Sequence, residues 1–263
     1  MIKIFSFVKD EADKIQDWIK YHSYIVGIEN IFIVDHMSTD GTYEILQKYK
    51  GLNLIRSNVP FHKKSEVLSS CMKKQIGFLI PLDADEFLCY KSNDIVCEAT
   101  LIKNYISKLP IGSYRYKFHQ LDVIPKETKV NDPLIELTEF KTKWYNDWQL
   151  YAKTFYHSST FISTDQGNHK GSVVGRGDNF ITDLVIIHFD VYDYDHFCKK
   201  VIRGATSYGH INNRQLISGK GKHYHRRYWA IKDGRGLDIM KAEFGSTTIF
   251  KTDCLSKKLK SLR

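Results

Sequence analysis

Short apolar runs alternate with helical stretches in the first third of this sequence, and this alternation is what most constrains the fold. Four runs rich in Ile, Phe, Val and Leu have the length of buried strands: 2–8, 31–34, 52–56 and 78–82. Three stretches between them predict helices: 10–25, 42–50 and 64–74. Strands that alternate with helices form parallel βαβ units, so we expect an α/β fold with a Rossmann-like, mainly parallel central sheet.

The pattern changes after residue 110, where strand signals predominate. Residues 113–121, 151–157 and 184–189 predict strands, and 194–208 predict a helix. No repeat or low-complexity linker interrupts the chain of 263 residues. We therefore expect a single domain whose C-terminal half is of α+β type.

An acidic motif, LDADEFL at 82–88, follows the fourth apolar run. Ligands of open α/β sheets bind at the carboxyl ends of the strands. Asp83 and Asp85 are two residues apart, so on an extended backbone they point the same way and can share Mg²⁺ or Mn²⁺. The alternative is a solvated acidic turn, because isolated D-x-D patterns are common.

A second polar segment, DHMSTDGT at 35–42, follows the second apolar run. Ser38 or Asp40 can cap the next helix, and Gly41 permits a tight turn. A capped turn does not explain Asp35, which stands at the end of a buried strand. A nucleoside offers N–H and O–H donors that this carboxylate can accept.

These segments in this order resemble the family-2-type glycosyltransferases. The resemblance is to the branch with a VKNE-like opening, a D-x-x-S-T-D-G-T turn and a D-x-D-E-F-L metal motif; the opening here is VKDE, with Asp10 in place of Asn. A later segment, IIHFDVYDYDHFCKKVIRGATSY, is similar to the C-terminal pattern of the same branch. The resemblance implies a GT-A fold, a nucleotide-sugar donor, a divalent cation and inversion at the anomeric carbon. A UDP-sugar is the first candidate for the donor.

The resemblance also implies roles for residues of the first half. The nucleobase pocket would be bordered by Val8, Lys9 and Glu11. Asp35 would accept a hydrogen bond from the base or ribose, and Asp83 would lie near the ribose and the metal-bound diphosphate.

Further roles concern the metal and the diphosphate. Asp85 would be the main protein ligand of Mn²⁺ or Mg²⁺, with Asp83 beside it, and His188 would be a second metal or diphosphate contact. A satisfied core histidine is the alternative for His188. Lys200 and Arg203 would neutralise the departing diphosphate, although a solvated helix face explains them equally well.

The reaction needs a base that takes the proton of the acceptor hydroxyl. The candidates are Asp165, favoured because it lies in the polar turn STDQGNHK, then Asp147 in WYNDW, and His169. For Asp165 an ordinary loop cap is the alternative. Aromatic residues at 144–151 can form a platform for a sugar acceptor or, alternatively, one face of a helix.

These roles divide the expected single domain into three parts. Residues 1–110 would bind the nucleotide, 111–210 would hold the acceptor and the catalytic base, and 211–263 would be a basic extension. The acceptor would be a glycan, a lipid or a protein.

Positive charge is concentrated at the C-terminal end. Residues 196–263 hold 16 Lys and Arg against 4 Asp and Glu, whereas the whole chain has a net charge of +9. Such a patch suits a diphosphate or an anionic surface, and HYHRRYWA at 223–230 can form a lid over a diphosphate or a polyanion contact. We expect no specific nucleic acid.

Two other function classes compete with the glycosyltransferase. A nucleotidyltransferase on a related α/β fold would bind the same kind of ligand, but VKDEADK lacks the glycine-rich phosphate loop expected near its N-terminus. A nucleic-acid-binding module would rely on the basic end, whereas the DADE carboxylates repel phosphate without a cation.

Compartment signals are weak and consistent. No apolar stretch approaches the length of a membrane span, and the N-terminal apolar run is too short for a signal peptide. The 5 cysteines are odd in number and lack C-x-x-C spacing, so we expect reduced thiols with neither a disulfide framework nor a structural zinc site. A cytoplasmic location is the expectation.

Overall fold

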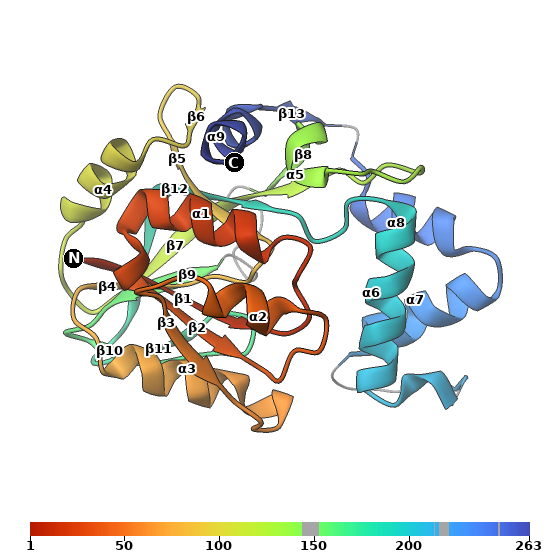
Figure 1. Ribbon diagram of the computed structural model, residues 1–263, viewed down its shortest axis with the longest axis horizontal. Helices are drawn as coiled ribbons and strands as arrows, with labels where there is room; N and C mark the ends of the chain where they lie inside the picture. Colours follow the sequence, from red (N-terminus) through yellow and green to blue (C-terminus); the bar gives the residue numbers. More distant parts are fainter. Residues whose placement is uncertain (144–152, 213, 216–220, 247) are drawn as a thin grey trace. The chain divides into compact units, whose positions relative to one another are not determined.

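The computed structural model describes residues 1–143, 153–212, 214–215, 221–246 and 248–263 (Figure 1). The chain forms two compact units. The first unit comprises Met1–Leu121, Lys143–His188 and Asp253–Arg263. The second comprises Asp122–Thr142 and Phe189–Thr252.

The first unit is built on a mixed sheet with the strand order β3-β2-β1-β4-β9-β7-β12-β5-β6. Four adjacent strands are parallel: β1 (Ile2–Val8), β2 (Ile31–Asp35), β3 (Asn53–Arg56) and β4 (Phe78–Pro81). The path continues through β5 (Glu86–Lys91), β6 (Ile95–Val96), β7 (Tyr114–Val123), β9 (Thr154–His157) and β12 (Asp178–His188). Strand β9 runs antiparallel to β4 and β7, and β5 runs antiparallel to β12 and β6.

Helices surround this sheet. They are α1 (Ile15–Val26), α2 (Thr42–Gln47), α3 (Lys64–Lys73), α4 (Ala99–Ser107) and α9 (Cys254–Leu262), with 3-10 turns at Ile28–Asn30 and Phe61–Lys63. A separate hairpin joins β10 (Phe161–Thr164) to β11 (Gly171–Val173). Figure 1 shows α1 and α3 on opposite sides of the parallel strands.

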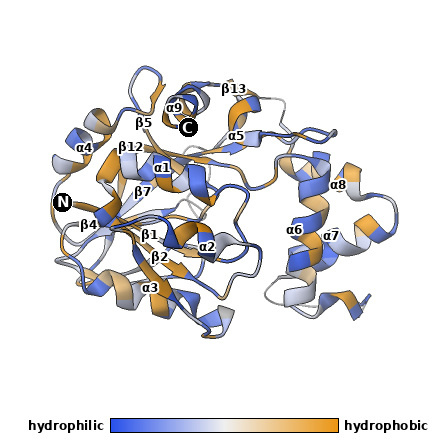
Figure 2. Ribbon diagram, in the orientation of Figure 1, coloured by the Kyte–Doolittle hydropathy of each residue, from blue (hydrophilic) through white to orange (hydrophobic). Residues whose placement is uncertain are grey.

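The core lies against both faces of these strands. Five consecutive residues of β1, Ile4–Val8, are buried, which requires cover on both sides. Phe5 and Phe7 pack with Leu68 and Met72 of α3. Figure 2 shows β1 and β2 as largely hydrophobic, whereas α1 alternates between hydrophobic and hydrophilic residues, as expected for a helix with one buried face.

The second unit is mainly helical. It contains β8 (Glu139–Lys143) paired with β13 (Phe250–Lys251), and the helices α5 (Pro133–Glu136), α6 (Tyr194–Ser207), α7 (Lys222–Lys232) and α8 (Gly236–Phe244), with a 3-10 turn at His210–Asn212. Its small core joins Phe197 and Val201 of α6 to Met240 of α8. Asp193 caps α6, since its Oδ1 accepts from His196 N–H at 2.7 Å.

The predicted α/β class is confirmed, with parallel strands over the first four predicted segments and antiparallel strands beyond them. Helix α1 begins five residues later than predicted, because residues 10–14 form a loop in which Asp10 has a φ of 54°. Residues 223–230 lie within α7 and are helical, and their role over a diphosphate stays a prediction. The functional division near residues 110 and 210 stays a prediction.

Among the described residues, no helix is both long and apolar enough to cross a membrane.

Candidate functional site

The parallel strands bring three of the predicted segments to one edge of the sheet. Val8 at the end of β1 pairs with Asp35 at the end of β2, and Leu82, just after β4, donates its N–H to the C=O of Phe5 in β1 (2.8 Å). The carboxyl ends of β1, β2 and β4 therefore meet, and the loops that follow them share one edge. Ligands of open α/β sheets bind at this edge.

The loop after β1 and the loop after β2 are joined by hydrogen bonds. Three N–H groups of the first loop donate to side chains of the second: Asp10 to Ser38 Oγ (3.0 Å), Glu11 to Thr42 Oγ1 (2.8 Å) and Ala12 to Asp40 Oδ2 (2.9 Å). Thr39 N–H donates in return to Asp10 Oδ1 at 2.8 Å. An Asn at position 10 would accept the same bond, and both residue types tolerate a positive φ, so the VKDE form preserves this joint.

Asp35 is fully buried and only partly satisfied. Its Oδ2 accepts from Ser38 N–H at 3.2 Å and lies 3.4 Å from Arg56 Nε. Its Oδ1 is buried and has no hydrogen-bond partner among the described residues. A buried acceptor without a donor costs about 1–3 kcal/mol, so Asp35 Oδ1 is suited to accept from a bound ligand.

The carboxylate of Asp83 is held by two lysines. Its Oδ1 lies 2.8 Å from Lys64 Nζ, and its Oδ2 lies 2.7 Å from Lys153 Nζ. Burial alone would raise the pKa of Asp83, but Lys153 and Lys64 outweigh it and hold the pKa well below its usual value. Asp83 is therefore ionised at neutral pH with its charge compensated by the protein.

Glu86 is the buried member of the same group. It is fully buried, its Oε1 lies 2.8 Å from Lys153 Nζ, and its Oε2 accepts from the N–H of Asp83 at 2.9 Å. Burial raises the pKa of Glu86, whereas ion pairing raises that of Lys153 against the effect of its own burial. Lys153 thus bridges the two carboxylates and fixes the acidic turn.

Helix α1 holds the backbone of the same turn. The indole N–H of Trp18 donates to the C=O of Asp83 (3.1 Å) and to the C=O of Glu86 (2.9 Å). Trp18 is fully buried. One side chain therefore fixes the backbone at the first and last residues of the segment 83–86, and Asp85 lies between them.

Asp85 and His188 form the pair most suited to a cation. His188 stands opposite Glu86 in the β12–β5 ladder, and its Nε2 lies 3.6 Å from Asp85 Oδ1. The side chain of His188 is 15% exposed and that of Asp85 is 16% exposed, so a cation can reach both from solvent. Their ligand atoms are close enough to share a metal ion.

Gln120 supports the imidazole of His188 from behind. Gln120 Nε2 lies 3.0 Å from His188 Nδ1. A half-turn of this amide would present its oxygen to Nδ1–H and leave the Nε2 lone pair directed at Asp85. The pair and its support therefore fit Mn²⁺ or Mg²⁺, with a carboxylate oxygen as one ligand and an oriented imidazole as the other.

The predicted base lies in the loop between β10 and β11. Asp165 Oδ1 accepts from Lys170 N–H at 3.1 Å, and the C=O of His169 accepts from Lys117 Nζ at 2.6 Å and Thr154 Oγ1 at 2.7 Å. Burial lowers the pKa of Lys117 to about 8. Thr154 is the first residue of β9 and directly follows Lys153, so this loop is tied to the chain next to the lysine of the acidic turn.

The remaining predicted residues divide into three groups. Val8 is buried, with its C=O accepting from His36 N–H at 2.8 Å, while Lys9 is exposed and Glu11 Oε2 pairs with Lys14 at 2.8 Å. Lys200 and Arg203 belong to α6 of the second unit, where Lys200 donates to the C=O of Asp190 (2.9 Å) and Arg203 is exposed. Asp147 and the aromatic segment 144–151 lie outside the described residues.

Sequence reasoning missed several residues of this edge: Arg56, Lys64, Gln120, Lys153 and Trp18. Only Arg56 carried a signal, because it ends a predicted strand next to the one that ends in Asp35. Lys153 and Gln120 reach the site from strands remote in sequence, which no local pattern reveals.

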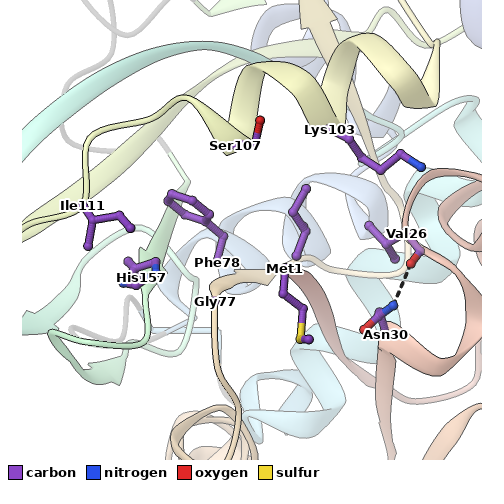
Figure 3. Close-up of a pocket in the computed structure, with 10 residues that line it drawn as sticks. Met1, Val26, Asn30, Gly77, Phe78, Lys103, Ser107, Ile111 and His157 are labelled. Carbon is purple, nitrogen blue, oxygen red and sulfur yellow. Dashed lines mark hydrogen bonds between the residues drawn. The ribbon is translucent and has the colours of Figure 1, made fainter.

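A pocket of about 420 Å³ lies at the opposite end of the parallel strands (Figure 3). Met1, Ile2 and Gly77 line it, and these residues stand at or before the starts of β1 and β4. Figure 3 shows the Asn30 side chain donating to the C=O of Val26 there, at 2.8 Å. None of the predicted site residues lines this pocket.

No protein-family model and no curated protein matches this sequence.

Proposed function

We propose that this protein is a metal-dependent, inverting glycosyltransferase of GT-A fold that uses a nucleotide-sugar donor. A UDP-sugar is the first candidate for this donor. The observation that carries the proposal is the meeting of two features at one sheet edge. One is Asp35, with a buried carboxylate oxygen that lacks a donor; the other is the Asp85–His188 pair beside the acidic turn. A nucleoside satisfies the first, and a cation-bound diphosphate suits the second.

The nucleoside would lie over the joined loops of β1 and β2. Asp35 Oδ1 would accept an N–H of the base or an O–H of the ribose, which removes the cost of an unsatisfied buried acceptor. Val8, Lys9 and Glu11 would border the base, since the first loop is fixed to the second by four hydrogen bonds.

The diphosphate would lie at the turn after β4. Asp85 and His188 would hold Mn²⁺ or Mg²⁺, which supplies positive charge where the leaving diphosphate becomes more negative. Lys64 and Lys153 already offset the charge of Asp83 and Glu86, so an anionic ligand meets less repulsion here than three carboxylates alone would cause. Asp83 would then contact the ribose and the edge of the diphosphate.

Transfer requires removal of a proton from the acceptor hydroxyl as its oxygen attacks the anomeric carbon. Asp165 is the proposed base, with His169 and Asp147 as the other candidates. The acceptor is proposed to be a glycan, a lipid or a protein. Inversion follows from a single displacement on the face opposite the departing diphosphate.

A screen of nucleotide sugars tests the proposal. Purified protein is mixed with UDP-, GDP- and CDP-sugars with and without Mn²⁺, and both the thermal midpoint and free nucleoside diphosphate are measured. We expect UDP-sugars to raise the thermal midpoint and to be hydrolysed slowly, and we expect both effects only when Mn²⁺ is present. Release of pyrophosphate from a nucleoside triphosphate and a sugar phosphate, with no response to any nucleotide sugar, would instead indicate a nucleotidyltransferase.

A further inference from the structure

Three cysteines that are far apart in the sequence meet in the first unit. Cys89 lies on β5, Cys97 follows β6, and Cys254 is the first residue of α9. The Sγ atoms of Cys89 and Cys97 are 3.6 Å apart, those of Cys97 and Cys254 are 2.9 Å apart, and all three lie within 4.8 Å of one another. Separations of 8 and 157 residues conceal this group from any spacing rule.

We propose that Cys89, Cys97 and Cys254 form a binding site for a thiophilic d¹⁰ cation, Zn²⁺ in particular. Three thiolates at a Zn–S distance of about 2.3 Å place their sulfur atoms roughly 3.8 Å apart in a tetrahedral site. The observed sulfur triangle needs only sub-ångström to ångström adjustments to reach that spacing. The site is distinct from the Asp85–His188 pair, whose oxygen and nitrogen donors suit harder cations.

The surroundings favour a bound cation. Cys254 stands at the N-terminus of a nine-residue helix, where the helix dipole stabilises a thiolate. The hydroxyl of Tyr21 lies 3.5 Å from Cys89 Sγ as an outer contact. Cys89 and Cys97 are buried while Cys254 is half-buried, so a cation and a fourth ligand, such as water, can enter from the side of Cys254.

A pair of thiols that forms a reversible disulfide is the alternative, and it fits the positions of these three sulfur atoms less well. A disulfide joins two sulfur atoms, whereas here Cys97 contacts both of the others. Three sulfur atoms within 4.8 Å of one another match a cation site better than a single bond between two of them.

Such a site would fix the position of the C-terminal helix, α9. A zinc ion would tie the start of α9 to β5, the strand that begins at Glu86 of the acidic turn. Ion pairs hold the rest of α9: Lys258, in the middle of the helix, pairs with Glu98 (2.9 Å), and Arg263, just after it, pairs with Asp17 (2.7 Å).

Metal binding to the reduced full-length protein tests the proposal. Protein is equilibrated with Zn²⁺ in a weak chelator, and bound zinc is counted by elemental analysis. Co²⁺ is the spectroscopic probe, because thiolate ligation gives a sulfur-to-cobalt charge-transfer band. We expect one zinc per chain, and at least about 100-fold weaker binding in Cys97→Ser and Cys254→Ser.

Matched controls separate this site from the rest of the chain. Cys71→Ser and Cys198→Ser remove thiols outside the group, and Asp85→Asn disables the other candidate metal site; each should keep the zinc and the cobalt band. Cys254→Ser is the gentlest variant, because Cys254 is only half-buried, and its metal-free thermal midpoint shows whether it folds. Zinc lost equally from Cys71→Ser, no stoichiometric zinc in the reduced protein, or a Cys97–Cys254 disulfide in place of zinc would each overturn the proposal.

Discussion

Asp85 is the residue on which the metal assignment rests. Replacing it with Asn preserves the side-chain shape but removes the charge that faces His188. We expect Asp85→Asn to weaken Mn²⁺ binding by at least about 100-fold with little effect on unfolding, because Asp85 is not part of the Lys153-bridged group. Calorimetric titration with Mn²⁺ measures this. Asp94→Asn, at an exposed position between β5 and β6, is the matched control, and equal Mn²⁺ affinity in both variants would exclude Asp85 as a ligand.

The role of Gln120 is positioning, through His188. We expect Gln120→Ala to weaken Mn²⁺ binding by about 10–100-fold, the range typical of outer-shell partners of ligating histidines. Gln120→Glu, which can still accept from Nδ1–H, should recover most of the affinity. If Gln120→Ala binds Mn²⁺ as the wild type does, His188 is not an oriented ligand.

Asp35 tests the nucleoside half of the site. Asp35→Asn keeps the size of the side chain but places an N–H₂ group or a weaker acceptor where the unsatisfied oxygen stands. A hydrogen bond to a charged group contributes about 1.5–3 kcal/mol, so UDP affinity should fall by roughly 10–150-fold. Calorimetry with UDP and Mn²⁺ measures the change, and urea unfolding checks that the buried substitution still folds. Unchanged UDP affinity would remove Asp35 from the site.

At the scale of residues, the sequence predicted the anions better than the cations. Asp35 and Asp83–Glu86 follow buried strands, and strand ends can be read from hydropathy alone. Lys153 cannot be read in this way, because it reaches Asp83 across 70 positions of sequence and only the antiparallel pairing of β9 with β4 brings it there. The sequence alone therefore could not predict that two lysines compensate the negative charge of Asp83.

Helix α1 determines the shape of the metal turn, and one substitution isolates this effect. Trp18→Phe keeps an aromatic ring in the core but removes the N–H that donates to Asp83 and Glu86. We expect a loss of about 1–2 kcal/mol in stability and about 10-fold in Mn²⁺ affinity, because the turn loses a fixed end. Urea unfolding and Mn²⁺ titration measure the two effects. Lost stability with unchanged Mn²⁺ affinity would show that the turn holds its shape without Trp18.

The packing of α1 on β5 also predicts an acid sensitivity. His22 is fully buried, its Nδ1 lies 2.9 Å from the C=O of Trp18, and burial lowers its pKa from 6.5 to about 3. A histidine with a lowered folded pKa stabilises the fold above pH 6.5, and this contribution is lost as pH falls towards 3. For this single group the loss is about 2 kcal/mol at about pH 5.

The comparison that checks this is between the wild type and His22→Gln, which does not titrate. Between about pH 7.5 and 5 the unfolding free energy of the wild type should fall by about 2 kcal/mol more than that of the variant. Parallel acid dependence in the two proteins would show that His22 is not buried as a neutral ring.

At the scale of elements, hydropathy located the buried strands and missed those with weaker signals. Strands β1, β2 and β4 match the predicted runs because nearly all of their residues are apolar and most are buried, and β3 matches through Leu54 and Ile55 although it is only partly buried. Strand β5 was absorbed into the acidic motif, since its first residue, Glu86, is a carboxylate buried only through its ion pair with Lys153. Helix α7 was missed because His, Arg and Tyr at mixed positions obscure its apolar face, and α8 was missed because it is only nine residues long and begins with Gly.

At the scale of the whole molecule, the basic excess of the last quarter is partly internal. Glu243 pairs with Arg226 and Arg227, each at 2.7 Å, and Asp233 pairs with Arg214 (2.8 Å) and Arg235 (3.3 Å). Each of these acids thus serves two arginines, so half of the positive charge in each trio is uncompensated. The sequence predicted the excess, whereas its distribution follows from how α7 and α8 pack. The proposed contact with an anionic surface would use the uncompensated remainder.

The central claim is that the carboxyl edge of the parallel strands binds a nucleoside diphosphate together with a divalent cation. The most direct measurement is UDP affinity by calorimetry in four conditions: wild type and Asp85→Asn, each with and without Mn²⁺. We predict at least about 10-fold tighter UDP binding with Mn²⁺ in the wild type, and no such gain in Asp85→Asn. UDP binding that ignores Mn²⁺, or the same gain in both proteins, would contradict the account.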